Sequence, residues 1–244
     1  MTFLEHLDEL RVRLIHAMVA LAVGFAVCWY FHERLFWFLT QPLRRAYPEV
    51  EFIFTSPTEA LMLHMKMSFF VGIFVAAPYL LYQVWAFVSP GLYPHEKAYA
   101  VPFIAAGSFF FMGGAAFGHF YLFPLTFKFM VSFGGPGMKF LPRVGEYYSF
   151  YSWFLLGLGA VFQLPVVIFI VARIGLVTPG WLLKQFRYAI LVSFIVAAII
   201  TPTPDVVTQS MLALPMLGLY LLGVLVAWLF GRPRRIAPDA ETQA

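Results

Sequence analysis

Long apolar stretches recur along the whole 244-residue chain, and they constrain its fold more than any other feature. A helix that crosses the hydrocarbon core of a bilayer needs about 20 predominantly apolar residues. The candidate stretches are approximately residues 14–32, 65–88, 98–126, 148–172, 187–200 and 206–230. Only 11% of the residues are charged, whereas about 25% is usual in soluble domains. The sequence therefore predicts an all-α integral membrane protein with six transmembrane helices.

No hydrophilic stretch is long enough to fold as a separate domain. We therefore expect a single polytopic membrane domain over residues 1–244, with a six-helix core at 1–235 and a disordered tail at 236–244. The basic residues are scattered around the apolar segments and form no continuous basic stretch, so we expect no nucleic-acid partner. The sequence lacks a glycine-rich phosphate loop, an HExxH motif and a GxSxG motif. We expect neither enzymatic activity nor a cofactor.

The fifth apolar stretch, RYAILVSFIVAAII, is short for a membrane span. At about 1.5 Å per residue it is only about 20 Å long, against a hydrocarbon core of about 30 Å. The turn TPTPD at 201–205 then sends the chain back towards the same side. Asp205 is placed to cap the sixth helix, or alternatively to form a polar docking edge on a short hairpin.

Basic residues at the helix ends predict the orientation. The loops on the side of the N-terminus are the shorter ones and have the higher density of Lys and Arg, and RPRR (232–235) directly follows the last apolar stretch. Cytoplasmic loops of membrane proteins carry an excess of Lys and Arg. We therefore expect both termini in the cytoplasm.

An acidic cluster precedes the first apolar stretch. In the segment EHLDELRVRL, Glu5, Asp8 and Glu9 would share one face of a helix, and Arg13 would follow Glu9 by one turn. Acidic residues are common in the first turn of a helix, where they interact favourably with its dipole. The cluster is either such a solvated first turn or part of a binding site.

A second acidic residue lies on the same predicted side of the membrane. The loop SPGLYPHEKAY (89–99) is short, contains Pro90 and Pro94, and carries Glu96. Two carboxylates on one membrane face could hold a cationic peptide, because guanidinium groups pair with carboxylates through two parallel hydrogen bonds. This pairing favours Glu9 and Glu96 as a binding site for arginine side chains.

Several longer segments resemble the TatC family, the receptor subunits of the twin-arginine protein translocase. The matching segments are HLDELRVRL (6–14), YQVWAFVSPGLYPHEK (82–97), FPLTF (123–127), LPV after Gln163, and TPDVVTQSMLALPM (203–216). They are spread over essentially the whole chain. The resemblance implies a concave, glove-like bundle of six helices in which the last two are short, located in the bacterial inner membrane.

The resemblance also implies residue roles. Members of the family bind the paired arginines of twin-arginine signal peptides and help to export folded proteins by means of the proton-motive force. Glu9 and Glu96 match the two recognition glutamates, and Arg11 matches the basic residue of the N-terminal motif. The other residues that we place in the signal-peptide site are Leu10, Phe87, Pro90, Leu92 and Tyr93.

The expected protein partners are single-span subunits of the TatA and TatB types, together with further TatC copies and membrane lipid. The resemblance places their docking region near the fifth and sixth helices, where Thr201, Asp205 and Gln209 lie. Gln163 departs from the family, whose members often carry Glu at this position. Glutamine cannot ionise, but it can hydrogen-bond either a polar residue of a partner's spanning helix or a neighbouring helix of the same chain.

The sequence leaves some alternatives to the receptor interpretation. A secondary transporter for small solutes would have internal repeats and charged residues at mid-membrane, and we find neither pattern. Met62, His64, Met65 and Met67 form either a packing cluster or a soft-metal site. His119 is either a packed neutral residue or part of a proton relay.

Overall fold

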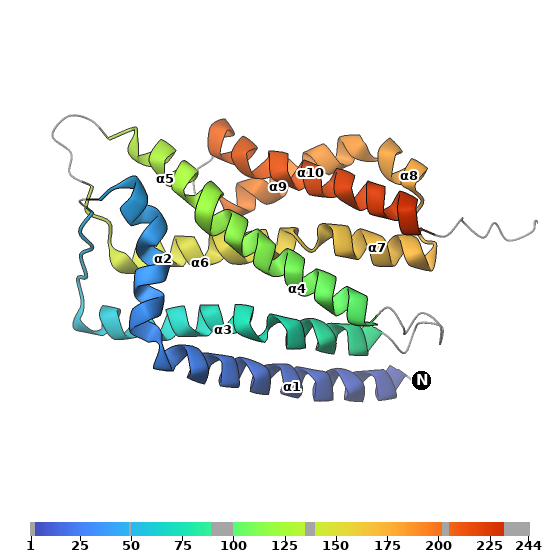
Figure 1. Ribbon diagram of the computed structural model, residues 1–244, viewed down its shortest axis with the longest axis horizontal. Helices are drawn as coiled ribbons and strands as arrows, with labels where there is room; N and C mark the ends of the chain where they lie inside the picture. Colours follow the sequence, from blue (N-terminus) through green and yellow to red (C-terminus); the bar gives the residue numbers. More distant parts are fainter. Residues whose placement is uncertain (1–2, 49, 89–99, 135–139, 202–204, 232–244) are drawn as a thin grey trace, which may run out of the picture. The chain divides into compact units, whose positions relative to one another are not determined.

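The computed structural model describes residues 3–48, 50–88, 100–134, 140–201 and 205–231. The chain is helical over most of this range (Figure 1). The helices are α1 (Phe3–Tyr30), α2 (His32–Ala46), α3 (Pro57–Val88), α4 (Ala100–Phe117), a π-helical turn (Gly118–Leu122), α5 (Phe123–Val131), α6 (Val144–Val161), α7 (Leu164–Ile174), α8 (Pro179–Lys184), α9 (Phe186–Ile200) and α10 (Val206–Phe230). In this part of the chain, β-structure is limited to an isolated parallel bridge between Ile53 and Arg143.

The helices form two compact units, residues 1–161 and residues 162–244. The first unit contains α1 to α6, and the second contains α7 to α10. Each unit is described by itself below. The interpretation of residues 1–244 as one membrane domain stays a prediction.

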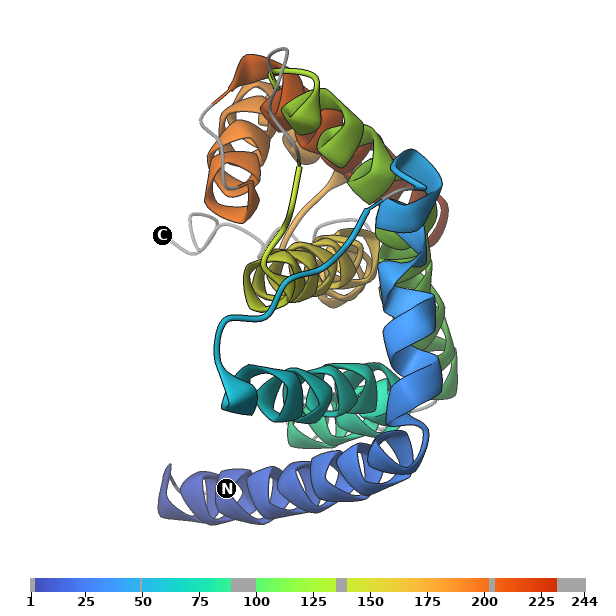
Figure 2. The same cartoon turned by 90° about the vertical axis from the view of Figure 1, so that its left-hand side faces the viewer.

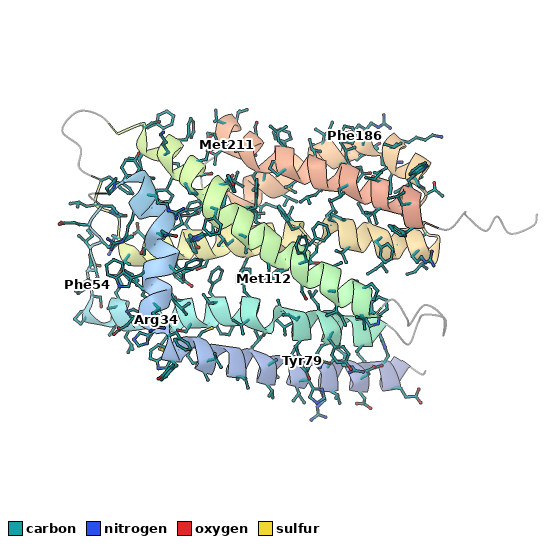
Figure 3. All side chains as sticks on the ribbon, in the orientation of Figure 1. Arg34, Phe54, Tyr79, Met112, Phe186 and Met211 are labelled. Atoms are coloured by element: carbon teal, nitrogen blue, oxygen red, sulfur yellow. The ribbon has the colours of Figure 1, made fainter. Side chains whose placement is uncertain are left out.

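Most of the helical stretches are long and apolar enough to cross a membrane. These stretches are Glu5–Tyr30, Pro57–Phe87, Val101–Val131, Val144–Ile174 and Val206–Phe230, and Phe186–Ile200 is a shorter apolar helix. Large apolar side chains cover much of the exterior, as Tyr79 and Met112 illustrate (Figure 3). The fifth span is short, as predicted, with 15 residues in α9. The sixth is not: α10 has 25 residues, because its apolar sequence is unbroken and Pro215 is accommodated within the helix.

Two glycines let α1 and α3 pack side by side (Figures 1 and 2). A Cβ atom added to Gly24 would lie 2.8 Å from the carbonyl oxygen of Gly72, and one added to Gly72 would lie 2.9 Å from the amide nitrogen of Phe25. Both neighbours are backbone atoms, which cannot rotate away. Glycine has no Cβ atom, so the two backbones can approach closely, as small residues allow at helix interfaces in membranes.

Helix α2 is an amphipathic helix that follows the first span, and it turns steeply away from α1 (Figures 1 and 2). Its apolar face buries Leu39 and Leu43, while Trp37 is 60% exposed. The guanidinium of Arg44 lies 4.5 Å from the centre of the Trp37 ring. Such a cation–π contact shields the charge while the aromatic ring stays at the surface.

The third span is interrupted by a π-helical turn, where we expected a single helix over 98–126. The turn Gly118–Leu122 precedes Pro124, which lies in the first turn of α5. Proline lacks an amide hydrogen and clashes with the preceding turn, so the helix must adjust before it. The turn carries His119, whose side chain is buried. Its burial agrees with the packed interpretation of His119.

The fourth apolar stretch is also divided, where we expected a continuous helix over 148–172. Helix α6 ends at Val161, and α7 begins at Leu164. Pro165 occupies the start of α7, where its missing amide hydrogen removes no helical hydrogen bond. Gln163 therefore lies at a helix break and not inside a helix.

The second unit has its own apolar core between α7, α8 and α10. The buried members are Ile168, Ala172, Leu182, Val224 and Ala227. The hydroxyl of Tyr220 donates to the carbonyl of Leu182 over 2.7 Å. Helix α8 was not predicted, and Thr178 caps it by accepting a hydrogen bond from the Trp181 amide.

Candidate functional site

The start of α1 meets the end of α3, and polar side chains from both helices come together there. Arg13 donates one hydrogen bond to Glu9 over 3.2 Å and a longer one to Gln83 over 3.4 Å. The side chains of Arg13 and Glu9 are 28% and 18% exposed. Gln83 is buried at 4% exposure. The acidic cluster therefore includes a carboxylate that is held in a partly buried setting.

Two polar atoms of this ion pair have no hydrogen-bond partner among the described residues. The second carboxylate oxygen of Glu9, Oε2, is buried and has no hydrogen-bond partner among the described residues. The same is true of the Nε atom of Arg13. Buried polar atoms without partners are rare in native proteins, and each one calls for an explanation. A cationic ligand would supply the donor that Glu9 Oε2 lacks.

An aromatic contact lies next to this ion pair. The imidazole of His6 stacks on the ring of Phe87, with the ring centres 4.4 Å apart. This contact joins the first turns of α1 to the last turn of α3. Leu10 is 43% exposed and Arg11 is exposed, so both are accessible on α1. Glu5 and Asp8 are exposed as well, in the manner of a solvated first turn.

Sequence reasoning found part of this cluster and missed another part. Glu9, Leu10, Arg11 and Phe87 lie at the junction of α1 and α3. Gln83 and His6 were missed, although a glutamine within the apolar stretch YQVWAF is itself a signal of a buried polar contact. Four residues predicted for the same site lie outside the described residues: Pro90, Leu92, Tyr93 and Glu96.

The second predicted region lies around the start of α10. The carboxylate of Asp205 accepts a 2.7 Å bond from the Thr208 amide and a 2.8 Å bond from the Thr208 hydroxyl. Gln209 donates to the carbonyl of Phe194 in α9 over 3.3 Å. Thr201 is buried and donates to the carbonyl of Ala197. The capping role predicted for Asp205 is confirmed. The side chain of Gln209 connects α10 to α9 by a hydrogen bond.

We expect Asp205→Ala to lower the free energy of unfolding by about 1 kcal/mol, the usual effect of losing an N-cap. Unfolding of the detergent-solubilised protein would measure this loss. Asp205→Ser restores a capping oxygen and should recover most of the stability. If both variants were as stable as the parent, the capping hydrogen bonds would contribute nothing.

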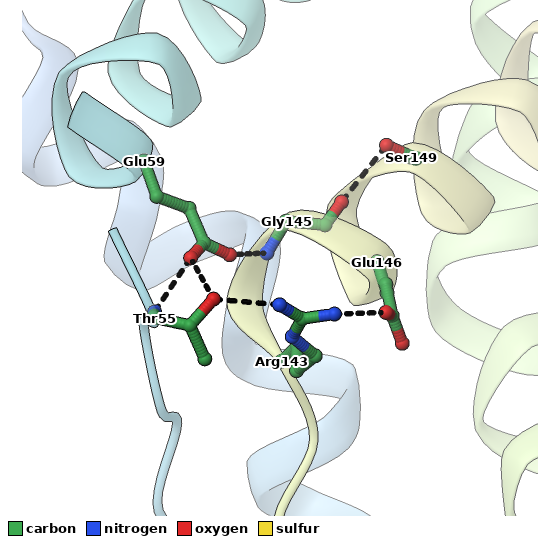
Figure 4. A network of polar contacts seen from close by, with 6 residues as sticks. All are labelled: Thr55, Glu59, Arg143, Gly145, Glu146 and Ser149. Carbon is green, nitrogen blue, oxygen red and sulfur yellow. Dashed lines mark hydrogen bonds and ion pairs between the residues drawn. The ribbon is translucent and has the colours of Figure 1, made fainter. Parts of the chain in front are cut away.

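A network at the opposite end of α3 was not predicted (Figure 4). The carboxylate of Glu59 accepts hydrogen bonds from the amides of Thr55 and Gly145, over 2.7 and 3.2 Å. Arg143 donates to the Thr55 hydroxyl and pairs with Glu146. The network thus links the first turn of α3 to the first turn of α6. The sequence SPTE (56–59) has the spacing of a capping box and could have revealed it.

The methionine and histidine cluster at the start of α3 is divided between buried and exposed positions. Met67 is buried, whereas Met62 and Met65 are 50% and 40% exposed, so the sulfur atoms are in different environments. His64 instead contacts the rings of His32 and Phe36. The packing interpretation accounts for this cluster.

The sequence model of the Sec-independent protein translocase protein (TatC) family matches residues 5–215. The chain belongs to the TatC family. A TatC protein of Koribacter versatilis is 40% identical over 251 residues, which cover 99% of this chain and 92% of the relative. One of Desulforapulum autotrophicum is 44% identical over 233 residues, which cover 95% of this chain and 86% of the relative.

Solved structures support the same assignment. A crystal structure of the twin-arginine translocase receptor TatC matches with a TM-score of 0.79 at 37% identity, and the match covers 93% of this chain and 100% of that one. A second crystal structure of the receptor, in DDM, matches with a TM-score of 0.80 at 38% identity. This match covers 91% of this chain and 99% of that one. The predicted all-α, multi-pass membrane fold is confirmed.

Membership of the TatC family also decides between the classes of function. TatC is a receptor component of a protein translocase and belongs to a transport family without enzymatic activity. The predicted translocase role is thereby confirmed, and the small-solute transporter finds no support.

Proposed function

We propose that this TatC protein binds twin-arginine signal peptides at its cytoplasmic face through Glu9, near the start of α1, and through Glu96, which follows α3 in the sequence. The observation that carries the proposal is the Glu9 carboxylate, whose Oε2 atom is buried and has no partner among the described residues. Glu9 stands at the exposed start of a membrane span. A peptide that arrives from the cytoplasm would meet this carboxylate before it enters the bilayer.

The chemistry of Glu9 suits arginine. A guanidinium is planar, stays charged, and presents several donors in a fixed geometry that matches a carboxylate. Lysine carries one compact ammonium group and cannot reproduce this bidentate pairing. The partly buried position of Glu9 strengthens charge-assisted hydrogen bonds relative to bulk water, because solvent screens them less.

The residues around Glu9 extend the proposed site along the peptide. The exposed Leu10 and the ring of Phe87 offer apolar surface to the hydrophobic part of a signal peptide. Arg11, which matches the basic residue of the family's N-terminal motif, follows Leu10 on α1. We assign Pro90, Leu92 and Tyr93 to the same site because they accompany Glu96 in the segment that matches the family.

We further propose that single-span subunits of the TatA and TatB types dock near α9 and α10, with further TatC copies in the assembly. Thr201, Asp205 and Gln209 gather where α9 ends and α10 begins. We assign Gln163, which lies at the helix break and carries an uncharged amide, to hydrogen bonding with a polar residue in a partner's span. Together these subunits would export folded proteins by means of the proton-motive force.

The proposed setting is the bacterial inner membrane with both termini in the cytoplasm. The supporting observation is the higher density of Lys and Arg in the loops on the side of the N-terminus. In this orientation Glu9 faces the compartment in which signal peptides are made.

Binding of a fluorescent signal peptide to the protein in nanodiscs tests the proposal. We expect the wild type to prefer an Arg-Arg peptide over its Lys-Lys counterpart. Glu9→Gln, Glu9→Ala, Glu96→Gln and Glu96→Ala should each weaken Arg-Arg binding by about 10- to 150-fold, as loss of a charge-assisted hydrogen bond worth about 1.5–3 kcal/mol predicts.

Glu33→Gln is the matched control, because Glu33 is an exposed acidic residue in the first turn of α2, at the other end of α1. It should leave both peptides unaffected. If binding were indifferent to the arginines and to both glutamates, these acidic residues would be ordinary helix-end charges and the proposed site would be wrong.

A further inference from the structure

The Glu9 carboxylate already holds a guanidinium, that of Arg13 from the next turn of the same helix. An incoming arginine therefore meets a carboxylate with one oxygen occupied and the other, Oε2, buried and without a partner among the described residues. A peptide guanidinium needs both oxygens for a bidentate pair, and a peptide ammonium is repelled by the charge of Arg13 for as long as Arg13 holds Glu9. On this basis, and resting on the proposed function above, we propose that Arg13 is an internal competitor for Glu9 that weakens the binding of every cationic peptide.

The contacts of Arg13 suit a group that can be displaced. It makes a single 3.2 Å bond to Glu9, and its bond to Gln83 is long at 3.4 Å. Its Nε atom is buried and has no partner among the described residues, and a single Nη2 bond reaches Glu9, so the guanidinium lacks the parallel two-bond geometry of a strong arginine–carboxylate pair. Pairs of residues four apart on a partly exposed helix face are worth little. A peptide guanidinium that reaches both oxygens can therefore replace Arg13.

Competition has a definite thermodynamic signature. The apparent affinity of any ligand is its intrinsic affinity multiplied by the fraction of receptor in which Glu9 is open. This fraction is a property of the peptide-free receptor and is the same for every ligand. Arg13 should therefore weaken Arg-Arg and Lys-Lys peptides by the same factor and leave their ratio unchanged. Such a device keeps weak cationic ligands unbound.

The variant Arg13→Gln tests the proposal in the same nanodisc binding assay. Glutamine can still hydrogen-bond Gln83 but carries no charge. We expect it to tighten the binding of Arg-Arg and Lys-Lys peptides alike, each by about fivefold, which corresponds to about 1 kcal/mol. Arg13→Lys keeps the charge and should stay within about twofold of the wild type. Arg34→Gln makes the same change of charge at the other end of α1 and should have no effect (Figure 3).

The double variant Arg13→Gln/Glu9→Gln separates this inference from the proposed function. The gain from Arg13→Gln should vanish when Glu9 is absent, because Arg13 then has nothing to compete for. A gain that persists, an unchanged affinity, or weaker binding of the Arg-Arg peptide would overturn the role of Arg13 as a competitor. Peptide binding to the single Glu9→Gln variant tests whether Glu9 belongs to the peptide site. Unfolding midpoints of all variants show whether each protein is folded.

Discussion

Replacing Gly72 by Leu should lower the free energy of unfolding by about 3 kcal/mol or more and separate α1 from α3. The new Cβ would lie 2.9 Å from the Phe25 amide nitrogen and 3.0 Å from the Gly24 carbonyl carbon. Overpacking usually costs about 1–3 kcal/mol, and the upper end applies here because backbone atoms cannot change rotamer. Reversible unfolding in detergent micelles measures the loss.

The control for this substitution is Gly113→Leu. Gly113 also lies inside a helix, α4, but a Cβ added there meets nothing within 4 Å. Both substitutions gain the same helix propensity, about 1 kcal/mol for leucine over glycine. The difference between the variants therefore isolates the contact between the helices. If Gly72→Leu and Gly113→Leu were equally stable, the close approach of α1 and α3 would be unnecessary for the fold. Since this contact aligns Glu9 with Gln83 and Phe87, Gly72→Leu should also weaken peptide binding.

The second large effect is expected at the hydrogen bond between His119 and Tyr151. Nδ1 of His119 lies 2.6 Å from the Tyr151 hydroxyl, and both residues are almost completely buried. His119→Phe keeps the stacking on Phe38, whose ring centre lies 4.5 Å away, but leaves the hydroxyl without this partner. Each single change, His119→Phe or Tyr151→Phe, should cost about 1–3 kcal/mol.

The double variant His119→Phe/Tyr151→Phe tests whether the two side chains act as a pair. Replacing both partners removes both polar groups, so His119→Phe/Tyr151→Phe should be more stable than the sum of the two losses implies. Tyr121→Phe is the control, because Tyr121 lies on the same π-helical turn but is 72% exposed. Additive losses in the double variant would show that the two side chains do not act as a pair.

The apolar stretches could be read from the sequence because a lipid-spanning helix is defined by its length and composition. Residues 206–230 match α10, and 187–200 match α9 with a difference of one residue. The cap at Asp205 was also predictable, because capping depends on residues within one helical turn. The breaks at the π-helical turn and at Gln163 were not predicted. Prolines mark both breaks, but the response of a helix to proline depends on which neighbours satisfy the freed backbone groups.

The candidate site shows the same division between local and tertiary information. Sequence motifs identified Glu9, Leu10, Arg11 and Phe87. They did not show that Arg13 occupies Glu9 or that Gln83 supports Arg13 from another helix. An i to i+4 pair can be foreseen, but its formation depends on burial and on competing partners. The Glu59 network likewise joins residues far apart in the chain.

By itself, then, the sequence of this protein determined its class as a helical membrane protein, the positions of its apolar spans and its membership of the TatC family. These properties follow from composition and from local motifs. Only the tertiary structure decided that Gly24 and Gly72 bring α1 and α3 into backbone contact, and that Glu9 has one oxygen paired and one without a partner among the described residues. The physical reason is that these features depend on distances between atoms of different helices or turns, which packing sets.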